Sequence, residues 1–401
     1  MNQGCLIYNT AECCTFVTQD FLIMVNKFII GACLLILVLS RLNAQENRHF
    51  TLLTFNQATP VKDQAYSGTC WSFGTLSFVE SELIRLGQEK TDLSEMFIVR
   101  HIYPEKAENY IRWHGKVFLT AGGQSHDVMR VVKEYGLMPE TTFSGRAGKN
   151  QPHHHQRLDS VITSVCKAIL KNGRPSSRYP QVISTMMDLY LGVPPDTFLY
   201  KRVSYTPATF RDAMGFNPED YIEITSYSDH PWYQPYVMDS RYNWSHDLYW
   251  NVPLEDFMEI IDHALENGYT LAWDGDVSEE GFSFEQAIGL VPLKPWTEQT
   301  AEERVRTFTG NEKELKVDDE LRMKTFRDGT TTIDHIMHIT GIAKDQRGKR
   351  YYYTKNSWGE FNGAGGYMYL SESYVRLKTV AVMVHRDAVP AGIQKKLGWT
   401  K

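Results

Sequence analysis

One stretch of the sequence, residues 64–86, limits what this chain can fold into more than any other. Its apolar residues recur at steps of three and four: Phe73, Leu76, Val79, Leu83 and Leu86. This spacing predicts a helix, which Gly87 then ends. Cys70 falls in the first turn, where unpaired backbone N–H groups and the positive end of the helix dipole favour a thiolate. Cys70 is therefore a candidate nucleophile, and the alternative is a buried, inert cysteine.

The residues around Cys70 favour the nucleophile. The segment Ser67–Trp71 matches three of the five positions of the papain-type signature Cys-Gly-[Ser/Ala]-Cys-[Trp/Tyr]. Six residues before Cys70, Gln64 can donate a hydrogen bond to the oxyanion that forms when a thiolate attacks a carbonyl. The stretch resembles the papain-fold cysteine peptidases. Ser67 stands where a disulfide cysteine would be, which indicates a branch without that disulfide.

A second pair of segments, residues 332–342 and 351–359, has the pattern of a β-hairpin, with Gly348 in the turn. Such a hairpin brings His335 and Asn356 alongside each other. A cysteine nucleophile needs a base to take its proton and a neutral group to orient that base, and these two side chains suit those roles. Trp358 can shield the pair from water, and we expect it to contribute to substrate binding.

Two histidines in this segment compete for the role of base. Side chains alternate along a strand, so His335 and His338, three residues apart, lie on opposite faces and cannot share one site. His335 has the spacing to Gly341 of the pattern His-x-Met-x-x-Thr-Gly. We therefore predict that His335 is the base and that His338 is either a bystander or a residue that contacts the site only through another side chain.

Taken together, these motifs resemble the bleomycin hydrolase and aminopeptidase C branch of the papain-like peptidases, over most of residues 55–390. His335 follows Cys70 by 265 residues, whereas compact papain-like enzymes place the two about 130–150 residues apart. This branch carries long insertions. Other matching segments are residues 93–95, 122–123, 276–277 and 363–367. The resemblance assigns catalytic roles to Gln64, Cys70, His335 and Asn356.

The resemblance implies an α+β papain-like fold: a helical half with the nucleophile, a β-barrel-like half with His335 and Asn356, and a large helical insertion. We expect the helical half at residues 45–142, the insertion at 143–247 and the β-rich half at 248–401. A second insertion is expected at about 278–330, where the sequence is charged and weakly patterned.

The implied activity is hydrolysis of peptide bonds through a thioester, aminopeptidase-like, with peptides as substrates and no metal or organic cofactor. Family members are often homohexamers, and in them a C-terminal arm lies in the cleft. Here only residues 391–401 follow Pro390, and three of the last eight are lysines. We expect this tail to reach the cleft but to restrict cleavage loosely. A cysteine endopeptidase or cell-wall peptide hydrolase is the alternative. A non-catalytic binding protein is disfavoured, because Cys70, His335 and Asn356 are all present.

Two further features have both a functional and a structural interpretation. Gly122 and Gly123 can let an extended substrate approach the backbone, and the alternative is a plain turn. Three adjacent histidines, His153–His155, suggest a metal site. Adjacent side chains cannot all point one way, and no other ligand stands at suitable spacing, so a solvated loop is favoured and no metal is expected.

The first 44 residues have the features of a signal peptide. Lys27 precedes an apolar run at residues 28–40, and a small residue, Ala44, marks a plausible cleavage site. Met24 is a candidate true start. The alternatives are a lipoprotein signal and a retained anchor helix, and an uncleaved signal would be the only membrane contact. These features predict export to the periplasm or the extracellular space.

After cleavage at Ala44, only Cys70 and Cys166 would remain, which leaves no structural disulfide. Cys166 lies in an apolar helical pattern and is predicted to be a core residue. The chain has 401 residues, 42% of them hydrophobic and 22% charged, a globular composition, with a formal net charge of −6. An acidic chain gives no electrostatic reason to expect a nucleic-acid partner.

Overall fold

The computed structural model describes residues 48–146, 148, 151–171, 173, 175–309 and 313–399. The site and the elements around it lie in one compact unit, which takes in His49–Phe308 and Glu312–Lys401. The predicted signal peptide at 1–44, with the choice of start at Met24, lies outside the described residues. None of the helices that are described is both long and apolar enough to cross a bilayer.

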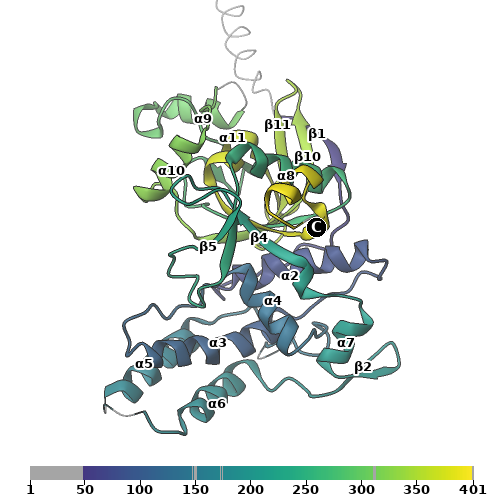
Figure 1. Cartoon of the computed structure of the whole chain (residues 1–401), viewed down its shortest axis with the longest axis vertical. Coiled ribbons are helices and arrows are strands. Elements are labelled where there is room, and N and C mark those ends of the chain that lie inside the picture. The colour runs from purple at the N-terminus through teal and green to yellow at the C-terminus, as the bar shows by residue number, and fades with distance from the viewer. Residues whose placement is uncertain are drawn as a thin grey trace, which may run out of the picture. The chain divides into compact units, whose positions relative to one another are not determined.

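One side of this unit is helical (Figure 1). Its helices in chain order are α2 (Cys70–Arg85), α3 (Glu95–Arg112), α4 (Ser125–Glu134), α5 (Gln156–Lys171), α6 (Tyr179–Leu191) and α7 (Pro207–Ala213). The first of them confirms the helix predicted from the apolar spacing after Cys70. Ser94 caps α3, its hydroxyl accepting a hydrogen bond from the backbone N–H of Phe97 at 3.0 Å.

Helix α2 is the centre of the helical side. Every residue from Trp71 to Leu83 is buried, as expected for a helix that is covered on all faces. Gly68 precedes α2 with φ +67°, a left-handed conformation that a glycine adopts without strain. Gly74 lets α2 approach the sheet closely, because a Cβ there would lie 2.6 Å from the carbonyl oxygen of Ile336. Both glycines fix where Cys70 lies.

The other side is a sheet. Within the described residues, ten strands follow one another in the order β5-β6-β4-β13-β7-β10-β11-β12-β9-β8, and β1 also pairs with β10. Their bounds are β1 (Phe50–Phe55), β4 (Tyr221–Thr225), β5 (Gln234–Val237), β6 (Leu248–Asn251), β7 (Leu271–Gly275), β8 (Phe282–Ser283), β9 (Ile288–Gly289), β10 (His335–Asp345), β11 (Arg350–Lys355), β12 (Tyr367–Ser371) and β13 (Thr379–His385). Strands β10 and β11 form the predicted hairpin.

The remaining elements are peripheral. The α-helices on the sheet side are α8 (Leu254–Glu266), α9 (Ala301–Thr309), α10 (Asp319–Arg327), α11 (Glu372–Lys378) and α12 (Ala391–Lys396). A separate hairpin and three short 3₁₀ helices complete the described elements: β2 (Phe198–Tyr200), β3 (Val203–Tyr205), η1 (Pro218–Asp220), η2 (Trp296–Glu298) and η3 (Arg386–Ala388).

Two hydrophobic cores meet at β10. Ile336 packs in the core of the helical side, and Met337 and Ile339 pack in the core between the sheet and α8. Each such buried side chain contributes about 1.5–3 kcal/mol relative to an exposed one. The alternation confirms that odd and even residues of this strand face opposite sides.

The segment predicted as an insertion, residues 143–247, divides at Tyr221. Its first part forms α5, α6, the β2–β3 hairpin and α7, whereas β4 and β5 belong to the main sheet. Within residues 278–330, β8 and β9 likewise join the edge of the sheet. Both segments that we predicted to be insertions therefore contribute strands to the main sheet.

The histidine triplet is not a solvated loop. His153 and His155 are buried, at 3% and 4% exposure, and only His154 is exposed. His153 packs edge-on against Phe73, and its Nε2 accepts a hydrogen bond from Arg146 Nε at 3.1 Å. Tertiary packing against α2 overrides the local polarity from which solvation was predicted.

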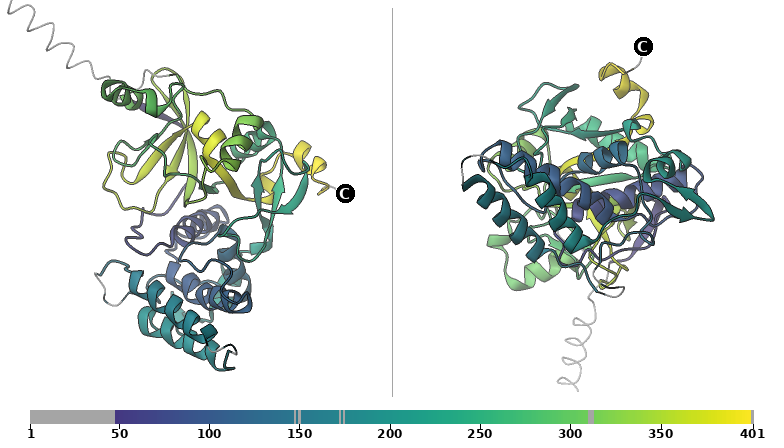
Figure 2. Two further views of the ribbon diagram at one scale, coloured as in Figure 1. Left: turned by 90° about the vertical axis from the view of Figure 1, so that its left-hand side faces the viewer. Right: turned by 90° about the horizontal axis from the view of Figure 1, so that it is seen from below.

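The C-terminal segment does not lie where we expected it. Ile393 and Leu397 are buried in the core between the sheet and α8, and Trp399 packs edge-on against Trp250 of β6. Lys396 pairs with Asp256 of α8 at 2.8 Å. Both views of Figure 2 show the C-terminal end at the periphery. The tail, as described to Trp399, thus packs on α8 and β6 rather than in the cleft.

Candidate active site

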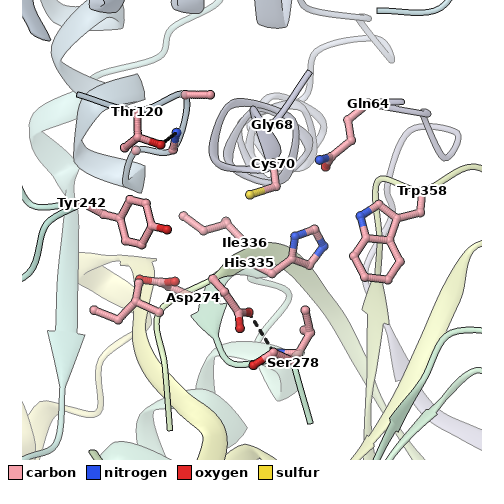
Figure 3. A pocket seen from close by; sticks show the side chains of 16 residues that line it. Gln64, Gly68, Cys70, Thr120, Tyr242, Asp274, Ser278, His335, Ile336 and Trp358 are labelled. Carbon is pink, nitrogen blue, oxygen red and sulfur yellow. Dashed lines mark hydrogen bonds between the residues drawn. The ribbon is translucent and has the colours of Figure 1, made fainter. Parts of the chain in front are cut away.

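A cavity of about 450 Å³ opens between the start of α2, the loop at residues 120–123 and the ends of β7 and β10 (Figure 3). It is lined by six residues that the sequence singled out: Gln64, Cys70, Gly122, Gly123, His335 and Trp358. Asn356 lies behind His335 and completes the predicted set. Segments nearly 300 residues apart in the sequence thus converge on one cavity.

Cys70 is the first residue of α2 and is partly exposed at the cavity. Burial raises the pKa of its thiol to about 11. The backbone N–H groups of Ile336 and Trp71 act against this rise, whereas the carboxyl group of Asp274 adds to it. The helix position was expected to favour the thiolate, but burial outweighs it here. The resting group is a thiol that needs a base.

His335 is held by Asn356. The imidazole Nε2 lies 2.8 Å from Asn356 Oδ1, and both side chains are buried. Because an amide oxygen only accepts, Nε2 carries the hydrogen and Nδ1 is left to take a proton. Burial lowers the pKa of His335 to about 4, although the bond to Asn356 acts to raise it. The imidazole is therefore neutral near pH 7.

Trp358 covers this pair. Its ring centroid lies 4.7 Å from that of His335, with 38° between the planes. Phe282 and Phe284 contact Trp358 edge-on from the other side. The aromatic group thus places an apolar cover over the imidazole, as expected from the sequence, while Trp358 also lines the cavity.

Gln64 borders the cavity from the loop before α2. Its Oε1 accepts a hydrogen bond from Ser357 Oγ at 2.6 Å, and its backbone N–H donates to the carbonyl of Ser357 at 2.9 Å. These bonds fix the amide and leave Nε2 as the group that can donate to an oxyanion. Ser357, which the sequence analysis did not single out, thereby couples Gln64 to the segment directly after β11, in which Asn356 lies.

The loop with Gly122 and Gly123 is fixed by two buried donors. Lys106 Nζ donates to the carbonyl oxygens of Thr120 and Gly122, and Trp71 Nε1 donates to that of Ala121 at 2.8 Å. Burial lowers the pKa of Lys106 to about 8. The loop borders the cavity as a binding strip for a peptide backbone would, and this binding role stays a prediction.

His338 lies away from the cavity. It is fully buried, and its Nδ1 lies 2.9 Å from Ser77 Oγ on α2. Burial lowers its pKa well below the usual value, and Lys355 nearby lowers it further. Of the two histidines, His335 is the one that the cavity contains, which agrees with the strand-parity prediction.

Other predicted features have structural places. Cys166 is fully buried in α5, and burial raises its pKa to about 11. Both cysteines that the structure describes are free thiols. Across the described part of the chain, no cluster of three or more His, Cys, Asp or Glu side chains is arranged to hold a metal ion.

Two cavity residues escaped the sequence analysis. Asp274 ends the apolar run 271–273 of β7, and Tyr242 comes from the segment assigned to the insertion. A charged residue that closes an otherwise apolar strand was the one local signal for Asp274. Tyr242 had none, because its place depends on a fold that brings β5 and β6 beside the helices.

The sequence is similar to several peptidases. It is 22% identical over 384 residues to aminopeptidase G of Lactobacillus delbrueckii subsp. lactis, covering 85% of this chain and 84% of that protein. It is 21% identical to aminopeptidase C of Streptococcus thermophilus, covering 82% and 81%, and 19% identical to the mitochondrial cysteine proteinase 1 of Saccharomyces cerevisiae strain JAY291, covering 89% and 81%.

A solved structure, that of PepW from Lactobacillus rhamnosis HN001, matches this one with a TM-score of 0.66 at 18% identity, covering 87% of this chain and 84% of that chain. The two share the papain-like, mixed α+β fold. The model of the Peptidase C1-like family matches residues 32–399. The chain therefore belongs to the Peptidase C1-like family, the cysteine peptidases of the bleomycin hydrolase and aminopeptidase C type.

Proposed function

We propose that this protein removes residues from the amino ends of peptides, with Cys70 as nucleophile and His335 as base. The observation that carries the proposal is the imidazole of His335, neutral and held at 2.8 Å by Asn356, in the cavity that also contains the partly exposed Cys70. The aminopeptidase names of the relatives support the choice of substrate end.

The geometry supports the following steps. His335 Nδ1 takes the proton of the Cys70 thiol, and the sulfur attacks the peptide carbonyl. Gln64 Nε2 donates to the oxyanion. His335 then gives its proton to the leaving amine, which leaves an acyl thioester on Cys70. Water, deprotonated by the same imidazole, hydrolyses the thioester and restores the thiol. Asn356 keeps the ring oriented throughout.

The test is to replace the nucleophile. Cys70→Ala should reduce peptide hydrolysis by at least about 10⁴-fold, since the loss of a nucleophile in such a site removes nearly all catalysis. Circular dichroism and the melting temperature should stay close to those of the unmodified protein, because only one sulfur is removed. Cys166→Ala is the matched control and should keep its activity. Residual activity of Cys70→Ala within tenfold would contradict the proposal.

The choice of amino end has its own measurement. A peptide library with free and with acetylated amino ends, analysed by mass spectrometry, should show stepwise loss of residues from the free peptides. Cleavage within the acetylated peptides at comparable rates would instead favour the endopeptidase alternative.

We further propose that the protein is exported. The proposal rests on the apolar run at residues 28–40 after Lys27 and on the small residue at Ala44. Expression of the full chain should yield a mature protein outside the cytoplasm whose first residue is Gln45. A protein that keeps its first residues and stays in the cytoplasm would contradict this.

A further inference from the structure

Asp274 is a buried carboxyl group without a partner at the wall of the cavity. It lies on β7, it is 4% exposed, and it borders the cavity together with Cys70 and His335. Neither of its oxygens receives a hydrogen bond from the residues that the structure describes. Figure 3 shows it on the side of Tyr242, across the cavity from Gln64 and Trp358.

Two neighbouring carboxylates are satisfied, which sets Asp274 apart. Asp276 accepts hydrogen bonds from the backbone N–H groups of Ser278 and Thr332, at 2.9 and 3.0 Å. Asp334 accepts from the backbone N–H of Val277 at 2.9 Å. These two hold the loop together. Asp274 has no such backbone donors, and only the amide of Gln124 acts toward it as a hydrogen-bond donor. Most of the free-energy cost of burying its carboxyl group is therefore not offset.

The surroundings of Asp274 disfavour its charged form. Burial raises its pKa well above the usual value, and the carboxylates of Glu223 on β4 and Asp334 before β10 raise it further. The amide of Gln124 and the imidazole of His126, both from the region of α4, act in the opposite direction. A cation that entered the cavity would favour the charged form of Asp274.

Asp274 lies close to the predicted nucleophile. It pairs with Ile336 across β7 and β10, and directly opposite residues of an antiparallel pair have Cα atoms about 4.5–5.5 Å apart. The backbone N–H of Ile336 in turn bonds the thiol of Cys70. One strand thus separates the nucleophile from the carboxyl group. The amino group of a terminal residue is two bonds from the carbonyl carbon that Cys70 would attack, so it would enter the cavity that Cys70 and Asp274 both line.

Tyr242 closes the cavity beyond this point. Its ring lies against Gly122, where a Cβ would come within 2.5 Å of it. The guanidinium of Arg241 stacks on the ring at 4.9 Å, and Trp244, two residues on, donates to Asp127 Oδ2 at 3.1 Å. The ring is therefore held in place. A peptide lying along Gly122 and Gly123 has little room to extend past it.

We propose that Asp274 is a specificity-determining residue that binds the positively charged nitrogen at the amino end of the substrate, with Tyr242 as the wall that stops a longer chain. This deepens the proposed function and rests on it. It also assigns to the sheet the role that a C-terminal segment was expected to have, since the described tail packs on α8 and β6. The ammonium donates hydrogen bonds to the carboxylate, and the carboxyl proton leaves to solvent.

The test compares Asp274→Asn with the unmodified enzyme on one peptide, with its amino end free or acetylated. For the free peptide, kcat/KM should fall about 10- to 100-fold through KM, with kcat within a few-fold, because a charge-assisted pair is lost. The acetylated peptide should show no such fall. Asp262→Asn, which removes a carboxylate on α8 far from the cavity, is the matched control. Equal changes on both peptides would overturn the inference.

Two further measurements distinguish this role from a structural one and from binding of a basic side chain. A merely structural role predicts a lower melting temperature for Asp274→Asn, whereas removal of an unpaired buried carboxyl group should leave it unchanged or higher. Two acetylated peptides, one with lysine and one with norleucine next to the cleaved bond, test whether Asp274 binds a basic side chain of the substrate instead of its amino end. A loss in Asp274→Asn for the lysine peptide alone would assign Asp274 to a basic side chain and overturn the role at the amino end.

The proposed function and this inference fail in different ways. An unmodified enzyme that hydrolyses neither peptide contradicts the proposed function. Calorimetric binding of the free peptide to Cys70→Ala, with and without Asp274→Asn, then still tests Asp274 without turnover. The inference expects binding at least tenfold weaker in the double variant, and equal affinities would overturn it.

Discussion

His335 and His338 lie three residues apart in β10, yet their side chains have different surroundings. We expect His335→Ala to lose peptide hydrolysis by at least about 10³-fold while the melting temperature stays within a few degrees, because a base is removed from a cavity wall. Peptide hydrolysis and thermal unfolding, measured side by side, check this.

His338→Ala should behave in the opposite way. It leaves a void beside Ser77 and removes a buried hydrogen bond, so we expect a loss of about 2 kcal/mol of stability with kcat within a few-fold. Urea unfolding and kinetics on the same samples measure both. If His338→Ala loses turnover and keeps stability, the assignment of the two histidines is wrong.

The pH dependence of activity follows from the burial of His335. The base works only when neutral, and its pKa of about 4 means that it becomes protonated only as the pH falls through that value. We expect kcat/KM to hold between pH 7 and about 5 and to fall about tenfold per unit below 4. Because the bond to Asn356 acts to raise that pKa, Asn356→Ala should shift the midpoint lower still. A midpoint near 6.5, the ordinary histidine value, would contradict this account.

At the level of single residues, the sequence could supply the groups that act through local motifs. Cys70, Gln64 and Trp358 stand in recognisable neighbourhoods, and strand parity separated His335 from His338. Asp274 could not be found in this way. Its role depends on being buried without a partner beside a cavity, and burial is set by contacts between segments far apart in sequence.

At the level of elements, the approach of α2 to β10 sets the distance between Cys70 and His335. Gly74 permits that approach, since an added Cβ would lie 2.6 Å from the carbonyl oxygen of Ile336. Gly74→Ala should push the helix away from the strand, lower kcat at least tenfold and destabilise the fold by about 1–3 kcal/mol. Gly392→Ala is the control, because a Cβ added at Gly392 would meet no atom within 4 Å. Unchanged kcat in Gly74→Ala would show that α2 tolerates the shift.

Periodicity was sufficient for the elements whose pattern is local. The three- and four-residue spacing after Cys70 gave α2, and Gly348 between two β-rich runs gave the β10–β11 hairpin. It was not sufficient for β4, whose residues 221–225 pair with β13 about 160 positions later. This strand has only five residues and is buried along its whole length. A run that short does not reveal from its own pattern which strand it pairs with, so its partner decides its place.

For the whole molecule, the C-terminal segment can be tested as a structural part and as a gate. Deleting residues 391–401 removes the buried side chains of Ile393 and Leu397, each worth about 1.5–3 kcal/mol. We expect a lower urea midpoint and an unchanged ratio of activities on free and acetylated peptides. Lys396→Met removes a partly exposed ion pair with Asp256 and a contact with the Tyr233 ring, and it should change stability little. If the deletion raised activity on acetylated peptides relative to free ones, the tail would act as a gate at the cleft, and its placement on α8 and β6 would be wrong.

The architecture as a whole was predictable because the two catalytic motifs, in this order and at this separation, occur in few folds. The placement of the C-terminal segment was not predictable, because it depends on whether an apolar surface elsewhere in the fold is available for a short helix to pack on. Ile393, Leu397 and Trp399 find one on α8 and β6.

The place of α12 on the outer side of the sheet has a practical consequence. None of the described residues of α12 lines the cavity, so a fluorescent protein, an affinity handle or a surface anchor could be joined to the chain beyond this helix. A protein or tag fused at this end can therefore be used to detect or immobilise the enzyme without blocking the binding of substrate peptides.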